Sequence, residues 1–180
     1  MYNRILVALD TLEPAVFETA LSVAAATEAD LLLLHVLSDR DPDSPTSPIT
    51  VAWDYATPLA EAAWESYQKQ WAAYVGKSLD RLREYTGRAD AAGVTSDFLQ
   101  VKNEPGRGIC NAAKTWNADL IVMGTHQRTG IKEPFMGSVS NYVMHHAPCS
   151  VMLVSLASEE TENSVEQSTE ACQVAQSRSS

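Results

Sequence analysis

Four nearly uninterrupted runs of apolar residues limit the folds open to this chain. They are ILVAL (residues 5–9), LLLLHV (31–36), LIVMG (120–124) and SVMLV (150–154). Strands buried on both faces, as in a parallel sheet, have continuous apolar runs, whereas half-exposed strands alternate. A fifth segment, VTSDFLQV (94–101), mixes polar and apolar residues and is expected nearer an edge. The runs therefore predict a parallel sheet with a buried centre.

Segments of helical character lie between these runs, at residues 14–27, about 59–86, about 107–116 and 138–146. The first begins at Pro14, which suits a helix start because the N–H that it lacks would have no partner there. Apolar residues then recur at the spacing of one helix face. Strands that alternate with helices predict an α/β fold with a doubly wound, open parallel sheet and right-handed crossovers.

The chain is expected to form one domain, residues 1–156, with a long variable surface loop and a tail. The loop, residues 39–58, contains four prolines and scattered Ser, Thr and Asp. Residues 157–180 are too poor in apolar side chains to fold, so we expect a disordered acidic tail. The helix after the loop carries an aromatic stripe, for which core packing or a helix–helix seam is favoured over a ligand cage. The stripe consists of Trp64, Tyr67, Trp71 and Tyr74.

The net charge and the cysteine pattern indicate which binding partners and which cellular compartment to expect. A formal net charge of −10 disfavours binding to nucleic acid and to anionic membranes, both of which rely on Lys and Arg. No segment approaches the roughly 18 apolar residues of a membrane span, and the N-terminus does not resemble a signal peptide. Cys110, Cys149 and Cys172 have no metal-ligand spacing, which favours free thiols in a reducing compartment. We expect a cytoplasmic protein with Cys110 and Cys149 in its core.

The sequence also predicts where a ligand would bind. In an open parallel sheet, ligands bind beyond the carboxyl ends of the strands, where the strand order reverses. Gly137 and Ser138 precede the last helix, whose first N–H groups and dipole can bind an anion. Because Gly137 has no Cβ, phosphate oxygens can approach the backbone, and His126, Arg128 and Lys132 could add positive charge. The alternative is an ordinary helix start with Ser138 as the N-cap and a bound water.

Other chemistries lack their motifs. The chain has no G-x-x-x-x-G-K-[ST] P-loop and no G-x-S-x-G hydrolase elbow. GRGICN (106–111) lacks the third glycine of a dinucleotide fingerprint. His145 and His146 are adjacent, so they face different directions on a helix, and no third ligand follows at metal-site spacing. His35 lies in a buried run and is expected to be a core histidine rather than a base.

The chain resembles the universal stress protein family over nearly the whole body, from Asn3 to Val154. ILVALD, LLLLHV, ADLIVMGTH and GSVSNYVMHHAPCSVMLV carry the resemblance. The nucleotide-binding branch has the motif Gly, two residues, Gly, nine residues, then Gly with Ser or Thr, and Gly124 and Gly137-Ser138 match its two ends. The resemblance implies an adenine nucleotide alpha hydrolase-like fold with strand order 3-2-1-4-5. It also implies a homodimer that pairs through the last strand, about Ser150–Val154.

ATP-binding members of the family imply a nucleotide site at the ends of strands 1, 2 and 4, with Mg²⁺ or Mn²⁺ neutralising the phosphates. By this resemblance, the adenine and ribose end would be lined by Ala8, Asp10 and Val36. The ribose and first phosphate would lie along Met123, Gly124 and His126. The β and γ phosphates would be held by Gly137, Ser138, Val139 and Ser140.

Gln127 stands in this site where the motif has its second glycine. If the position needs a left-handed backbone, the replacement costs roughly 1–2 kcal/mol, or about five- to thirtyfold in affinity. If it needs only close approach, the Gln side chain could swing aside or donate a hydrogen bond. We expect an ATP-binding, homodimeric stress-response sensor or switch with little or no hydrolysis, not a typical enzyme. The alternatives are a dimeric interaction protein without nucleotide affinity and a slow ATP-consuming enzyme.

Overall fold

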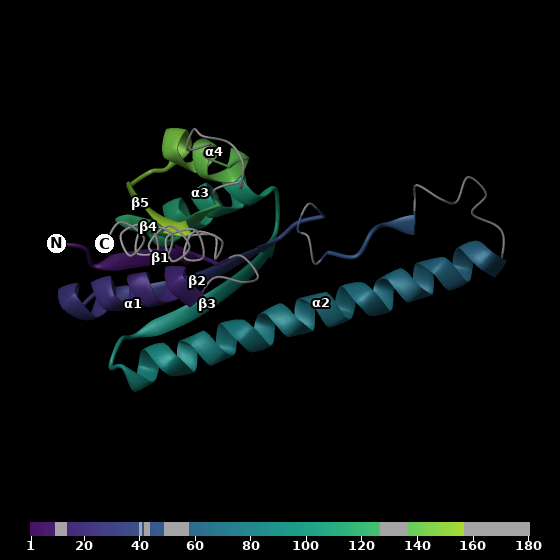
Figure 1. Ribbon diagram of the computed structural model, residues 1–180, viewed down its shortest axis with the longest axis horizontal. Coiled ribbons are helices and arrows are strands. Elements are labelled where there is room, and N and C mark those ends of the chain that lie inside the picture. The colour runs from purple at the N-terminus through teal and green to yellow at the C-terminus, as the bar shows by residue number, and fades with distance from the viewer. Residues whose placement is uncertain (10–13, 40, 42–43, 49–57, 127–136, 157–180) are drawn as a thin grey trace, which may run out of the picture.

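The fold is a five-stranded parallel sheet covered by helices on both faces (Figure 1). The computed structural model describes residues 1–9, 14–39, 41, 44–48, 58–126 and 137–156. The strands are β1 (Arg4–Ala8), β2 (Asp30–Leu37), β3 (Ser96–Lys102), β4 (Leu120–His126) and β5 (Ser150–Leu156). All pairs are parallel, and the order is β3-β2-β1-β4-β5. The predicted fold class and strand order are confirmed, and the mixed segment 94–101 does form an edge strand.

Four helices connect the strands: α1 (Pro14–Thr27), α2 (Pro58–Ala91), α3 (Pro105–Trp116) and α4 (Ser138–His146). Residues of α1 and α2 pack in one buried cluster with the sheet, and residues of α3 and α4 pack in the other. The sheet is therefore doubly wound. Within the described residues, no helix is long and apolar enough to cross a membrane. Most of the predicted loop 39–58 and all of the predicted tail 157–180 lie outside the described residues.

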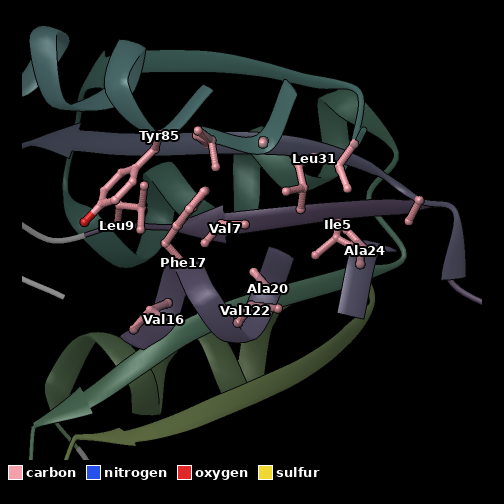
Figure 2. Packing of buried hydrophobic residues seen from close by; sticks show 14 of the residues in the cluster. Ile5, Val7, Leu9, Val16, Phe17, Ala20, Ala24, Leu31, Tyr85 and Val122 are labelled. Carbon is pink, nitrogen blue, oxygen red and sulfur yellow. The ribbon is translucent and has the colours of Figure 1, made fainter. Parts of the chain in front are cut away.

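The continuous apolar runs have the physical cause that the sequence predicted. Ile5 and Val7 face the cluster that contains Phe17 of α1, whereas Leu6 faces the cluster that contains Ile109 of α3. All five side chains are at most 4% exposed. Figure 2 shows Phe17 beside Tyr85 of α2, and their ring centroids are 4.3 Å apart. Because both faces of the central strands are covered, an alternating pattern has no place there.

A buried polar cluster joins α2 to the sheet. His35 of β2 is 4% exposed, as expected of a core histidine. Its Nδ1 lies 3.4 Å from Nε2 of Gln100 on β3, and its Nε2 lies 3.8 Å from the Asp41 carboxylate. The Tyr74 hydroxyl of α2 donates to the same Asp41 oxygen at 2.5 Å. The cluster holds the middle of α2 and the chain after β2 against the sheet.

Replacing Gly106 with alanine should destabilise the fold by about 1–3 kcal/mol, because the added Cβ overpacks a tight contact. That Cβ would lie 2.6 Å from Cδ1 of Tyr142 on α4, whose ring is stacked on His146. The matched control is Gly87→Ala, also in a helix, where an added Cβ meets nothing within 4 Å. We expect this control to stabilise the protein by about 0.4–1 kcal/mol. Urea unfolding measures the free energy of unfolding of both variants. Equal changes in the two variants would contradict the close packing of α3 on α4.

Candidate functional site

The strand order places the predicted site at the edge of the sheet that is formed by the carboxyl ends of its strands. From β1 the chain continues to β2 on one side, and β4 lies on the other, so the order reverses between β1 and β4. Ala8, at the carboxyl end of β1, is in register with Met123 of β4 and with Leu34 of β2. Val36 lies two residues further along β2, and Gly124 follows Met123. The register thus places Ala8, Val36, Met123 and Gly124 near one another at the carboxyl ends of neighbouring strands.

The first turn of α4 lies against the same edge. The Ser140 hydroxyl donates a hydrogen bond of 3.3 Å to the carbonyl of Gly124, which ties the start of α4 to the end of β4. Ser140 is 4% exposed, Val139 is half-buried and Ser138 is exposed. A phosphate placed at this turn would therefore contact backbone N–H groups and the exposed Ser138, whereas the Ser140 hydroxyl has a structural partner.

The N-cap of α4 is Gly137, not Ser138, so the proposed ordinary cap by Ser138 is wrong. Gly137 has φ −58° and ψ 156°, and no side chain of the described residues makes a capping hydrogen bond there. The first turn of α4 contains no acidic residue. By contrast, the N-terminus of α3 is capped by the Glu104 carboxylate, which accepts a hydrogen bond from the Arg107 N–H at 3.2 Å. In the part of the chain that the structure describes, the dipole of α4 thus has no carboxylate like the one at the start of α3.

Gly137 is not required by its backbone angles or by packing among the described residues. Its φ is negative, a region open to every residue. A Cβ built on it would meet none of the described residues within 4 Å. Among those residues, nothing fills the space beside Gly137, and a residue without Cβ lets an oxygen approach the backbone.

Four of the predicted residues, Asp10, Gln127, Arg128 and Lys132, lie outside the described residues. His126 ends β4, in register with Leu156 of β5. Its position brings it to the correct edge of the sheet.

Sequence reasoning missed Gly108, which sets the position of Val36. A Cβ on Gly108 would lie 3.0 Å and 3.1 Å from the two γ-carbons of Val36, so α3 approaches β2 closely only because this residue is glycine. The motif GRGICN is therefore a packing motif rather than part of a dinucleotide fingerprint. No spacing or composition marks this glycine, because its role depends on how closely α3 approaches β2.

The thiols on the face of the sheet that α3 and α4 cover are in structural positions. Cys110 of α3 and Cys149 before β5 are half-buried against the cluster under α3 and α4. Burial raises the pKa of the Cys110 thiol, and the nearby Glu104 adds to the rise. Burial also raises the pKa of Cys149, with smaller contributions from Asp119 and Cys110. Raised pKa values make these thiols poor nucleophiles. Cys172 lies outside the described residues.

No group of three His, Cys, Asp or Glu side chains within the described ranges is arranged to hold a metal ion.

The comparisons with known proteins agree with this architecture. Residues 1–155 match the sequence profile of the universal stress protein family. Universal stress protein Sll1388 of Synechocystis is 31% identical over 155 residues, covering 85% of this chain and 97% of that protein. Among solved structures, universal stress protein UspA from Lactobacillus plantarum is 25% identical with a TM-score of 0.62, covering 85% and 97% of the two chains. A family protein from Arabidopsis thaliana with AMP bound is 22% identical with a TM-score of 0.53, covering 88% and 95%. With its strand order, its helix arrangement and a match over most of its length, this chain belongs to the universal stress protein family.

Proposed function

We propose that this protein binds an adenine nucleotide, ATP with Mg²⁺ or Mn²⁺, and acts as a homodimeric stress-response sensor or switch. One observation carries the proposal: the start of α4 at Gly137, which no described side chain caps, is tied through Ser140 to the end of β4 at the point where the strand order reverses. The N–H groups of the first turn and the positive end of the helix dipole suit a polyphosphate.

The proposed ligand extends across the sheet edge from this turn. The γ and β phosphates would contact the N–H groups of Ser138, Val139 and Ser140, close to Gly137. The ribose would lie over Met123 and Gly124, and the adenine over Ala8 and Val36. This order is supported by the register of β1 with β4, which sets Ala8 beside Met123. It is also supported by the family relation, since the related Arabidopsis protein was solved with AMP bound. Asp10, His126 and Gln127 belong to the same proposed site.

The proposal includes little or no hydrolysis of ATP. This expectation rests on the sequence, in which no side chain is obviously placed as a general base for attack by water. The bound nucleotide would therefore persist and act as a signal. The metal ion would neutralise phosphate charge and stay with the nucleotide.

The proposed homodimer forms through β5. In the described sheet this strand is hydrogen-bonded on one side only, to β4, so its other side is an edge that can pair. The segment about Ser150–Val154 would pair with its copy across a two-fold axis. We place the protein in the cytoplasm, without nucleic-acid or membrane partners, on the basis of its free cysteines and its net charge of −10.

Calorimetric titration of Mg·ATP into the full-length protein tests the proposal. We expect saturable binding with a dissociation constant of about millimolar or tighter. Gly137→Ala should weaken binding by about tenfold, since its Cβ occupies the open space beside the first turn, and Gly87→Ala, remote on α2, should bind like the wild type. If the wild type shows no saturable binding, or if Gly137→Ala binds equally well, the phosphate site is not at α4.

A further inference from the structure

One face of α2 carries a single stripe of residues along the whole helix. In the C-terminal half the stripe is buried against the sheet, and it consists of Tyr74, Ser78, Leu82, Tyr85 and Ala89. The same helical spacing continues toward the N-terminus with Ala60, Trp64, Tyr67 and Trp71. Residues 58–71, here called the projecting half, extend beyond the sheet (Figure 1). Leu59 is 80% exposed and Trp64 is 43% exposed. The same stripe is thus core in one half of the helix and surface in the other.

The aromatic side chains of the projecting half form an ordered row. The ring centroids of Trp64 and Tyr67 are 5.4 Å apart, and those of Tyr67 and Trp71 are 6.2 Å apart. At the base of the row, Lys102 Nζ lies 4.4 Å from the Trp71 ring centroid, and Tyr74 is held by Asp41. The base of the projecting half is therefore fixed to the sheet, and the row presents a preformed apolar surface.

We propose that the projecting half of α2 pairs antiparallel with the same half of a second copy of this chain. The stripe residues are spaced by four, three and four, which is the spacing of a two-helix seam. In the antiparallel direction Ala60 lies opposite Trp71 and Trp64 lies opposite Tyr67, so large residues meet smaller ones. A parallel pair would stack Trp64 on Trp64 and Ala60 on Ala60, leaving layers of unequal size.

The helix dipoles favour the same direction, because antiparallel pairing opposes them. Lys69 takes no part in the seam, since it lies two turns after Ala62 and therefore on the face of the helix opposite the stripe. At the margin of the seam Glu61 would face Gln68 of the second copy, so no like charges meet there.

The size of the contact fits a specific but modest association. Three partly exposed aromatic side chains per copy, with Leu59 and small flanking residues, would bury on the order of 1,000 Å² in total, near the lower limit for specific interfaces. α2 packs on β2 and β3, at the edge of the sheet opposite β5. This contact would therefore coexist with the proposed β5 dimer rather than compete with it.

Sedimentation velocity of the full-length chain over a range of concentrations tests the seam, with Trp64→Glu as the disruptive variant. Ala62→Glu is the matched control, because it adds the same charge to the exposed opposite face of the same helix. We expect Trp64→Glu to lower the mass of the largest species and Ala62→Glu to retain the wild-type mass. If the β5 pairing holds, the two interfaces lie at opposite edges of the sheet and link copies into species larger than a dimer, which Trp64→Glu should reduce to a dimer. If the β5 pairing does not hold, the change is from dimer to monomer. Mg·ATP affinity should be the same in both variants, so the seam and the nucleotide site are tested separately.

A charge exchange tests the direction of pairing. Gln68→Glu should weaken the association by roughly three- to tenfold, because it faces Glu61 of the second copy only in an antiparallel pair. Adding Glu61→Lys should restore it. An unchanged mass in Trp64→Glu would overturn the proposal. If the variant also loses thermal stability without a change of mass, the stripe packs against another part of the same chain rather than against a second copy. An ineffective Gln68→Glu would overturn the antiparallel arrangement.

Discussion

Replacing Ser138 with aspartate should lower the affinity for Mg·ATP by about 10- to 100-fold while leaving the fold as stable as before or slightly more stable. The two effects have opposite signs because the helix dipole attracts any negative charge. An acid in the first turn of α4, which has none, should stabilise the helix by about 0.3–1 kcal/mol. The same carboxylate would repel a phosphate held at this turn. Two charges about 5 Å apart at a partly exposed site repel by up to about 3 kcal/mol before screening by salt, and a tenfold loss of affinity corresponds to about 1.4 kcal/mol.

Ser138→Asn is the control for this experiment, since it has the shape of aspartate without its charge. Ser138 is exposed, so neither variant disturbs the core. The two proteins should be compared by thermal unfolding and by calorimetric titration with Mg·ATP. We expect the asparagine variant to stay within about threefold of the wild-type affinity. If aspartate and asparagine bind ATP equally well, the phosphates do not lie at the start of α4.

Replacing Phe17 with alanine should have the largest effect on stability, a loss of about 3–5 kcal/mol. Phe17 is fully buried between α1 and the sheet, and its ring stacks on Tyr85 of α2. The Arg88 guanidinium lies 5.0 Å from the same ring centroid. Truncation therefore removes the contact that joins the two helices on this face, and the rigid sheet beneath cannot collapse to fill the space.

Phe17→Leu is the matched variant, because it retains most of the apolar volume and should lose only about 1–2 kcal/mol. Urea unfolding measures both. The Mg·ATP affinity of the folded protein should not change in either variant, since Phe17 lies on the face of the sheet opposite α4. A loss below about 1 kcal/mol for Phe17→Ala would contradict the described packing of α1 on α2.

The sequence contained enough information for the sheet but not for all of the helix ends. Continuous apolar runs predicted buried parallel strands because burial on both faces removes alternation, whereas the strand order came from the family resemblance. The helix predicted to end near Thr86 continues to Ala91. Gly87 disfavours a helix locally, but Ala89 is fully buried and Arg88 packs over Phe17 and Tyr85. Tertiary packing thus outweighs the local propensity, which no periodicity in the sequence reveals.

In the candidate site, too, the sequence predicts some features and not others. Ala8, Met123 and Gly124 meet at one edge because parallel strands have their carboxyl ends together, a consequence of topology that sequence patterns capture. The roles of Gly106 and Gly108 depend on how closely α3 approaches Tyr142 and Val36. Such distances between elements have no signature in spacing or composition. The helix start predicted at Ser138 is confirmed, but the alternative of Ser138 as the N-cap is wrong, because Ser138 stands inside the helix and Gly137 is the cap.

The central claim is that the N–H groups at the start of α4 bind the phosphates of a nucleotide. A titration of ¹⁵N-labelled protein with Mg·ATP, followed by NMR, observes these groups one by one. The account predicts that the backbone amide signals of Ser138, Val139 and Ser140 shift most and saturate together with the calorimetric binding curve. Saturable binding that leaves these three signals in place and shifts signals elsewhere would contradict it.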